Sequence, residues 1–283
     1  SLLLTDLAEI KQMDEEIQNH FHHKLIWFEL DERNPFSSFV IHVQPLYIED
    51  FLAETLYLKK KAILYISNAL TIEHSFHYMI NQLGLTDFPV ITREFQNDKK
   101  KKHSVRFYSL NDLPNINEVD EQDYIEKICH YILTIAASAG RKLLVLFSSN
   151  EMLKKTYFLL KDSGALEEYL LMAQGISSGS LNRMAKQFTR FEKSILFSTN
   201  FNLDYIDLGH SPQTVIMVRL PFLSPKEPVH YRKARELKNK GINAFKALSL
   251  PEAVIRYKKC FVKLMDEQSK VKEIIMFDKR IFS

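Results

Sequence analysis

The chain has 283 residues, of which 46% are hydrophobic and 26% charged, enough apolar material for one substantial core or two smaller ones. Its apolar runs are far shorter than the roughly 18 to 20 residues of a membrane span, and two cysteines indicate neither a disulfide framework nor a four-cysteine cluster site. The 38 basic and 35 acidic residues leave a net charge of +3, which is compatible with a nucleic-acid partner but too small to indicate one. We therefore expect a cytoplasmic protein with no membrane partner, no secretory signal and no iron–sulfur cluster.

Helical and strand patterns alternate along the first part of the chain. The predicted elements are helix Asp6–Phe21, strands Lys24–Leu30 and Phe39–Val43, helix Glu49–Leu58, strand Ala62–Ile66 and helix Ile72–Leu83. The last helix stops at Gly84, a residue type that favours helix C-termini. A polar stretch with the run Lys99–Lys102, interpreted as a solvated loop rather than a DNA clamp, precedes the turn-rich segment 111–119. We place the domain boundary there, between residues 1–118 and 119–283.

Beyond this boundary the alternation becomes regular. The predicted elements are helix Gln122–Ala139, strand Leu143–Ser148, helix Glu151–Asp162, strand Tyr169–Ala173, helix Ser180–Phe191, strands Ser194–Ser198 and Thr214–Leu220, helices Val229–Asn239 and Pro251–Leu264, and strand Glu273–Phe277. The segments LLVLF, SILF, TVIMV and EIIMF are almost continuously apolar, as expected for strands that helices cover on both faces. This pattern predicts an α/β fold with a doubly wound, mainly parallel sheet.

Glycine is scarce in this chain, and several glycine-rich motifs are absent. None of the seven glycines lies in a G-x-x-x-x-G-K-[ST] loop or a G-x-G-x-x-G loop, so the chain has no P-loop and no dinucleotide fingerprint of its own. A nucleophile elbow and the zinc motif H-E-x-x-H are missing as well. His20, His22 and His23 lie close together, but no cysteine or carboxylate pair joins them at ligand spacing. We predict no metal site.

Five segments form an ordered series of motifs along the chain. They are GRKLLVLFSSNEML at 140–153, A-Q-G at 173–175 with the helix that follows, LPFLSPKEP at 220–228, NAFKALSLPEAVIRYKK at 243–259, and IIMFDKRI at 274–281. In this order they resemble motifs of the DinG and XPD branch of superfamily 2 helicases. The third is the most specific, because the family writes this turn L-P-F-x-x-P-x-x-P. The resemblance implies a RecA-like second motor domain, similar to a P-loop NTPase but lacking the P-loop.

The earlier part of the chain resembles the same family less sharply. The segment KKKAILYISNAL at 59–70 is similar to the strand that carries S-A-T-L near the end of the first motor domain, with S-N-A-L in its place. The resemblance implies that residues 1–118 hold the end of the first motor domain and that the chain is a fragment, with the P-loop upstream in the same protein. It also implies single-stranded DNA as a partner, and ATP with Mg²⁺ as cofactors of the whole protein.

The last helicase motif has changed in this chain. The family writes Q-G-x-G-R-x-x-R, whose arginines meet charge developing on the γ-phosphate of ATP, and in register this chain has Lys263 and Asp266. Lysine lacks the planar fork of arginine, and aspartate reverses the charge. The resemblance leaves Lys259, Lys263 and Asp207 as nucleotide-binding candidates, Asp207 only if one residue is inserted in a second decayed motif. It implies no intact catalytic residue, and we expect no ATP turnover by this chain.

Polar residues follow three of the predicted strands. Ser148, Ser149 and Asn150 follow the strand LLVLF, and Gln174 and Thr199 hold equivalent places after two later strands. Ligands of open α/β sheets bind at the carboxyl ends of the strands, and hydroxyl and amide groups suit phosphate contacts that do not read sequence. We predict these five residues as the nucleic-acid-binding set. The alternative is that they serve only the fold.

Three functions stay open at this point. The first is the C-terminal motor domain of an ATP-dependent DNA helicase, which holds single-stranded DNA and completes an interdomain ATP site. The second is a catalytically inactive DNA-binding module that serves an upstream 3′-5′ exonuclease, a domain that Gram-positive relatives often carry. The third is an unrelated α/β protein, for which the turn at 220–228 would lie away from the ligand edge of the sheet. Nucleotide-dependent unwinding by the intact protein distinguishes the first two.

Overall fold

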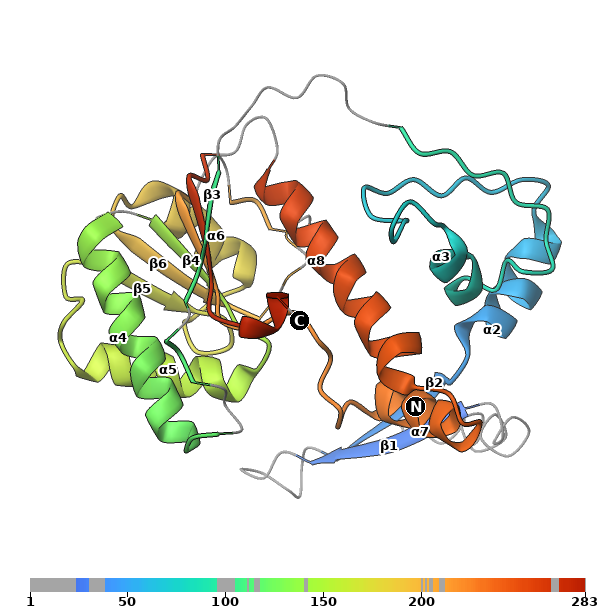
Figure 1. Ribbon diagram of the computed structural model, residues 1–283, viewed down its shortest axis with the longest axis horizontal. Coiled ribbons are helices and arrows are strands. Elements are labelled where there is room, and N and C mark those ends of the chain that lie inside the picture. The colour runs from blue at the N-terminus through green and yellow to red at the C-terminus, as the bar shows by residue number, and fades with distance from the viewer. Residues whose placement is uncertain are drawn as a thin grey trace, which may run out of the picture. The chain divides into compact units, whose positions relative to one another are not determined.

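The computed structural model (Figure 1) describes residues 24–30, 39–95, 105–110, 112–114, 118–139, 142–199, 201, 203, 206–208, 212–265 and 270–282. The chain forms two compact units. Unit 1 comprises Ser1–Glu94 and Pro225–Leu248, and unit 2 comprises Phe95–Ser224 and Ser249–Ser283. No helix in the described ranges is long and apolar enough to cross a membrane.

Unit 2 is built on a six-stranded sheet in which every neighbouring pair is parallel. Its strands are β3 (Arg106–Ser109), β4 (Lys142–Leu146), β5 (Leu170–Ala173), β6 (Ser194–Ser198), β7 (Thr214–Met217) and β8 (Glu273–Met276). They lie side by side in the order β3-β8-β7-β4-β6-β5. Because β4 lies in the middle and its sequence neighbours lie on both sides of it, the chain winds in two directions, as predicted.

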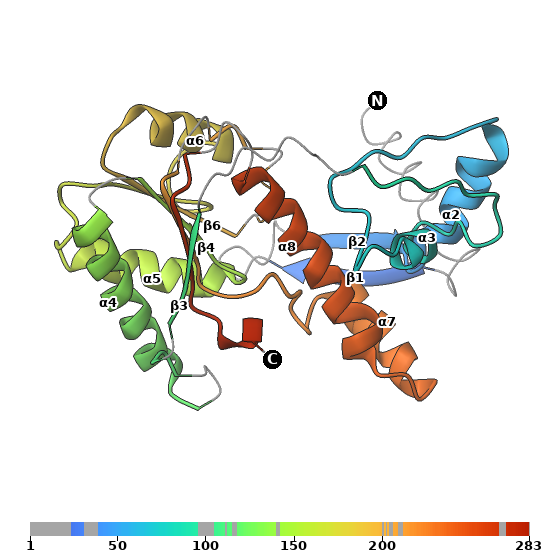
Figure 2. The ribbon, with the colours of Figure 1, turned by 45° about the horizontal axis from the view of Figure 1, so that its top comes forward.

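Helices cover both faces of this sheet (Figures 1 and 2). The helices are α4 (Glu121–Ala139), α5 (Asn150–Asp162), α6 (Leu181–Arg190) and α8 (Leu250–Leu264). Side chains of α4 and α5 pack with Leu143 and Val145 of β4 in one core, whereas α6 and α8 pack with Leu144 and Leu146 in the other. Alternate residues of one strand therefore supply both cores, which is why the strand is apolar at every position. The predicted doubly wound α/β fold is confirmed.

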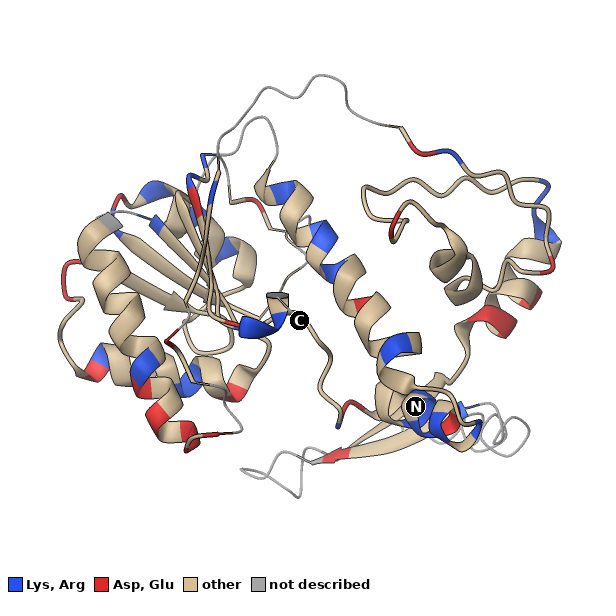
Figure 3. Ribbon diagram, in the orientation of Figure 1, with Lys and Arg blue, Asp and Glu red and all other residues tan. Residues whose placement is uncertain are grey.

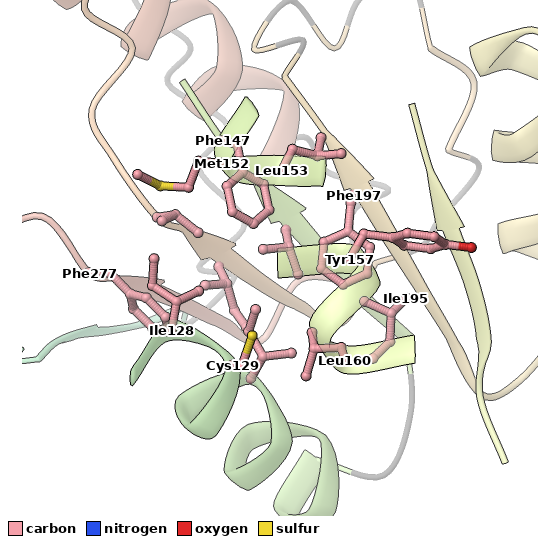
Figure 4. Close-up of a cluster of buried hydrophobic side chains, with 14 of the residues drawn as sticks. Ile128, Cys129, Phe147, Met152, Leu153, Tyr157, Leu160, Ile195, Phe197 and Phe277 are labelled. Atoms are coloured by element: carbon pink, nitrogen blue, oxygen red, sulfur yellow. The ribbon is translucent and has the colours of Figure 1, made fainter. Parts of the chain in front are cut away.

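The first of these cores surrounds the aromatic residues of the central strands (Figure 4). Phe197 of β6 is fully buried, and its ring centroid lies 6.0 Å from those of Phe147 and Tyr157. Cys129 belongs to this core and Cys260 to the core on the opposite face, so the two thiols cannot meet. Burial raises the pKa of each thiol to about 12. Both side chains therefore act as small apolar groups.

Unit 1 joins two segments that are far apart in the sequence. The first holds the antiparallel strands β1 (Lys24–Leu30) and β2 (Phe39–Pro45), then α2 (Ile48–Thr55), a 3₁₀ turn at Tyr57–Lys59 and α3 (His77–Gln82); the second holds α7 (Pro228–Asn239). Tyr47, just after β2, donates a hydrogen bond to Glu236 of α7, and the Lys233 ammonium lies 5.4 Å from the centre of the Tyr47 ring. These contacts fix α7 to the β1–β2 segment.

The end of α3 shows why a glycine stands at position 84. Gly84 has a φ of 65°, which disfavours other residues, and a Cβ there would lie 2.4 Å from the Cβ of Glu49. The Leu85 amide donates to the Ile80 carbonyl at 2.9 Å, which closes the helix in a Schellman arrangement. The predicted stop at Gly84 is confirmed, although α3 begins at His77 rather than at Ile72.

One strand prediction for the first part of the chain was wrong, and one strand there was missed. The segment 62–66 forms no strand, and Leu64 and Ile66 are 81% and 84% exposed. A strand needs a partner for its backbone groups, and no described segment pairs with this one. Conversely, β3 was not predicted and forms an edge of the sheet beside β8. The predicted helix 6–21 and the run 99–102 lie outside the described residues.

Candidate nucleic-acid interface

The predicted nucleic-acid residues lie at one edge of the six-stranded sheet. Strands β4, β6 and β5 are parallel neighbours, so their carboxyl ends meet there. Ser148, Ser149 and Asn150 follow β4, Gln174 follows β5 directly, and Thr199 follows β6 directly. The turn that begins at Leu220 follows β7 at the same edge. This position contradicts the third alternative, which required the turn to lie away from the ligand edge.

Gln174 connects two of these strand ends through its side chain. Its Oε1 accepts hydrogen bonds from the Ser198 hydroxyl at 2.8 Å and from the Thr199 backbone N–H at 3.0 Å. A backbone N–H can only donate, so the atom that it contacts must be the amide oxygen and not the nitrogen. The amide is therefore held with its Nε2 donors away from the strand ends, and no described residue accepts from them. Half-buried Gln174 thus presents a fixed NH₂ group at the edge.

Asn150 and Thr199 extend this network toward β4. The Thr199 hydroxyl donates to Asn150 Oδ1 at 3.0 Å, and Asn150 is the first residue of α5. Asn150 is exposed, so its amide nitrogen faces solvent together with the first N–H groups of α5. Side-chain amides, a hydroxyl and a helix N-terminus then lie together, and the nearby carboxylate of Glu151 in the first turn of α5 is paired with Lys155 at 3.0 Å. Such groups bind a phosphate through its oxygens and carry no information about bases.

The two serines of the predicted set have different surroundings. Ser149 is the N-cap of α5, and its Oγ accepts from the Met152 backbone N–H at 3.4 Å. Its structural role is helix capping. Ser148 is half-buried and makes no side-chain hydrogen bond within the described part of the chain. The Ser148 hydroxyl is therefore without a hydrogen-bond partner in the described chain, whereas the Ser149 hydroxyl accepts one bond from the helix backbone.

The predicted nucleotide-binding residues lie on two other segments. Asp207 is exposed between the buried residues Ile206 and Leu208, which anchor this loop in the core beside α6 and α8. Lys259 and Lys263 lie one turn apart on α8. Asp266 lies outside the described residues.

The described part of α8 does not fit a triphosphate as an arginine-finger helix would. Lys259 is half-buried and Lys263 is exposed, and both carry a single ammonium group. The one arginine of this helix, Arg256, donates to Glu252 at 3.2 Å. The one guanidinium of α8 is paired with a carboxylate, so this helix has no unpaired guanidinium for a γ-phosphate. We assign no step of ATP hydrolysis to α8.

Sequence reasoning missed a buried clamp beside this edge. Asp278, just after β8, accepts from the Leu220 backbone N–H at 3.0 Å and from Arg280 Nε at 2.9 Å and Nη2 at 2.5 Å. The Arg280 guanidinium lies 4.8 Å from the centre of the Phe222 ring. Burial raises the pKa of Asp278, but the hydrogen bonds and the Arg280 charge outweigh it and hold the pKa below its ordinary value. The clamp fixes the start of the Leu220 turn.

Comparison with known proteins identifies the family. A family described as "Helicase C-terminal domain" matches residues 132–283, which is more than half of the chain. The chain belongs to the helicase C-terminal domain family. The matched range contains the whole candidate nucleic-acid interface and the Asp278 clamp, whereas most of unit 1 precedes it.

Individual relatives agree with this assignment. The chain is 33% identical over 257 residues to "3′-5′ exonuclease DinG" of Bacillus subtilis, and 26% identical over 246 residues to the protein of that name from Staphylococcus epidermidis. These matches cover 90% and 87% of the chain but only 28% and 26% of the relatives, so the chain spans about a quarter of their length. The predicted relation to DinG is confirmed.

A solved structure shows the same fold. The structure titled "XPD_Helicase" matches 88% of the chain and 44% of its own, with a TM-score of 0.62 and 15% identity. At this identity the match shows the fold alone. The XPD-like helicase C-terminal domain architecture predicted from the motifs is confirmed.

Proposed function

We propose that this helicase C-terminal domain binds the phosphate backbone of single-stranded DNA at the carboxyl edge of its sheet. The fixed amide of Gln174 is the observation that carries the proposal, because its oxygen serves the fold and its NH₂ group is left for an acceptor. The amide of Asn150 and the hydroxyl of Ser148 supply further neutral donors beside it, whereas Thr199 donates its hydroxyl proton to Asn150 Oδ1. Neutral donors with no base-reading geometry favour binding that is independent of sequence.

We expect Gln174→Glu to weaken binding of a fluorescent oligo(dT) by roughly tenfold or more, the range of one lost charge-assisted hydrogen bond. Glutamate keeps the shape and still accepts from Ser198 and Thr199, but it places an acceptor and a negative charge where Nε2 stood. Gln187→Glu, an exposed position on α6, makes the same change of charge away from the edge and should bind like the parent. Fluorescence anisotropy of the 283-residue chain at low salt measures both. Equal affinity of the two variants would show that Gln174 does not face DNA.

For the whole protein we infer a DinG-type ATP-dependent DNA helicase in which residues 1–118 end the first motor domain and 119–283 form the second, except that β3 joins the sheet of unit 2 and α7 belongs to unit 1. The exposed apolar segment at 62–66 supports an additional partner for unit 1, because contiguous exposed apolar residues mark an interaction site. A neighbouring strand from the first motor domain would cover it. ATP and Mg²⁺ would bind between the two motor domains, with Lys263 and Asp266 as degenerate finger positions.

The names of the curated relatives favour a second candidate. They are called exonucleases, so we also infer that this domain serves as a catalytically inactive DNA-holding module for an upstream 3′-5′ exonuclease. Helix α8 presents lysines but no unpaired arginine to a triphosphate, and this supports weak or absent ATP turnover.

We expect the 283-residue chain to release no phosphate from ATP, with or without single-stranded DNA. The full-length protein then separates the two candidates in a strand-displacement assay on a forked duplex with and without ATP. ATP-dependent displacement supports the helicase. Digestion of the strand without displacement supports the exonuclease-associated module. ATP turnover that persists through further purification of the 283-residue chain would contradict the expectation of an incomplete site.

A further inference from the structure

The segment that unit 1 takes from the C-terminal half of the sequence is strongly basic. Residues 225–248 contain seven lysines and arginines and two glutamates, a net charge of +5. The remaining 31 basic and 33 acidic residues give the rest of the chain a net charge of −2. The small net charge of the whole chain therefore hides a local excess of positive charge, visible on α7 in Figure 3.

The solvent face of α7 holds most of this charge. Five of its residues are exposed and share one side of the helix: Tyr231, Arg232, Arg235, Lys238 and Asn239. Tyr231, Arg235 and Lys238 follow at steps of four and three residues, so they line up along the axis. The opposite side holds buried His230 and half-buried Leu237, and Lys233, which covers the Tyr47 ring.

Among the described residues of unit 1, acidic groups pair with one cation of this face. Arg232 Nε donates to Glu236 at 2.9 Å, and the same glutamate accepts from Tyr47. Arg235 and Lys238 have no ion-pair partner among the described residues. The helix dipole favours Lys238 in the last turn, but it does not account for Arg235, which lies nearer the middle. The described part of the chain therefore gives no internal partner to an arginine and a lysine that lie in a row with a tyrosine ring.

We infer that the solvent face of α7 is a second nucleic-acid-binding surface, with Arg235 and Lys238 on phosphates and Tyr231 against a base or sugar. A guanidinium fork and an ammonium bind phosphate oxygens, and a ring 55% exposed offers a stacking surface. None of the five residues of this face is acidic, so the face repels a nucleic-acid strand less than the rest of the chain does. None is aliphatic, so the face has no apolar stripe for a membrane. The inference rests on the proposed function only in taking nucleic acid as the class of partner.

The test compares three forms of the 283-residue chain with the parent. Arg235→Glu/Lys238→Glu reverses two charges on α7. Arg190→Glu/Lys161→Glu reverses one arginine and one lysine in the last turns of α6 and α5, at the opposite edge of the sheet from the candidate interface, and is the matched control. Gln174→Glu is the third form. The probe is a fluorescent 20-nucleotide oligo(dT), titrated at several salt concentrations.

We expect the α7 variant to bind roughly tenfold or more weakly at low salt. Its slope of log affinity against log salt should be shallower by about 1.4, since each single-strand phosphate contact contributes about 0.7. The control should keep the parent slope. If the control loses affinity equally, the effect is one of net charge alone and the inference fails. If Gln174→Glu weakens binding and the α7 variant does not, the inference fails while the proposed function stands. If the α7 variant weakens binding and Gln174→Glu does not, the proposed site at the sheet edge is rejected and the inference about α7 stands.

Photocrosslinking distinguishes direct contact between α7 and DNA from a long-range electrostatic effect of its charges. Irradiation of the complex with an oligonucleotide that carries 5-iododeoxyuridine should give an adduct at Tyr231, found by mass spectrometry. Adducts elsewhere with none on α7 would overturn the inference. Binding of polyglutamate or of phosphatidylserine vesicles with equal strength, lost in the same α7 variant, would assign the face to an acidic peptide or a membrane and would also overturn it.

Discussion

Phe197→Ala should lower the free energy of unfolding of unit 2 by about 3–5 kcal/mol, the range for a fully buried aromatic residue cut back to alanine. Phe197 is 0% exposed in β6, between the rings of Phe147 and Tyr157. Its carbonyl also accepts from the Gln174 backbone N–H at 3.0 Å. The cavity would lie in the core that holds the side chains of α4 and α5. Urea denaturation followed by circular dichroism measures the loss.

Phe191→Ala is the matched control, because Phe191 is 48% exposed and follows α6 immediately. It should cost no more than about 1 kcal/mol, since less apolar surface leaves a packed environment. Similar losses for the two variants would mean that the sheet core around Phe197 is not packed as described.

Asp278→Asn should destabilise unit 2 by about 2–3 kcal/mol at pH 7, less than the roughly 3–5 kcal/mol for breaking a fully buried ion pair. The smaller value applies because the Arg280 side chain is 43% exposed and stays partly hydrated, while that of Asp278 is 7% exposed. The neutral amide weakens the contacts to Arg280 and to the Leu220 backbone N–H. Asp162→Asn, at an exposed position that ends α5, should change stability by less than about 0.5 kcal/mol.

The effect of Asp278→Asn should depend on pH in one direction. The pKa of Asp278 in the folded chain lies below its ordinary value of 3.8, so its charged form stabilises the fold above that pH. As the pH falls through the lowered pKa, the carboxyl group takes up a proton and the advantage over asparagine disappears. The difference between parent and variant should be constant from pH 5 to 8 and narrow below about 4. A difference that grows in acid would show that the clamp does not stabilise the carboxylate.

The sequence predicted most of unit 2 because its inner strands are buried on both faces. β6 reads SILFS and is buried at every position, so the apolar run alone identifies it. β3 escaped notice because an edge strand pairs on one side only, and its Phe107 and Tyr108 stay 47% and 45% exposed. The segment 62–66 shows the opposite error. Its apolar run indicates a tendency to be buried but does not supply a neighbouring strand.

The positions of the interface residues were predictable, but their chemical roles were not. The rule for carboxyl ends of parallel strands places Asn150, Gln174 and Thr199 at one edge. The direction of the Gln174 amide depends on a backbone N–H of the neighbouring strand, which no local pattern reveals. The Asp278 clamp joins Leu220 to a residue 58 positions later. The charge on α7 was overlooked because the composition was summed over the whole chain.

The discontinuous make-up of unit 1 has a consequence during translation. Residues up to Glu94 leave the ribosome well before Leu248, which ends the second segment of that unit. At about 5–20 residues per second, the roughly 150 intervening residues take on the order of 10–30 s to appear. During this interval Tyr47 lacks Glu236, and the side of the β1–β2 segment that contacts α7 is open to chaperones or to neighbouring nascent chains. Ribosome profiling of chaperone-bound nascent chains should show occupancy that begins after Tyr47 has emerged and declines once α7 has.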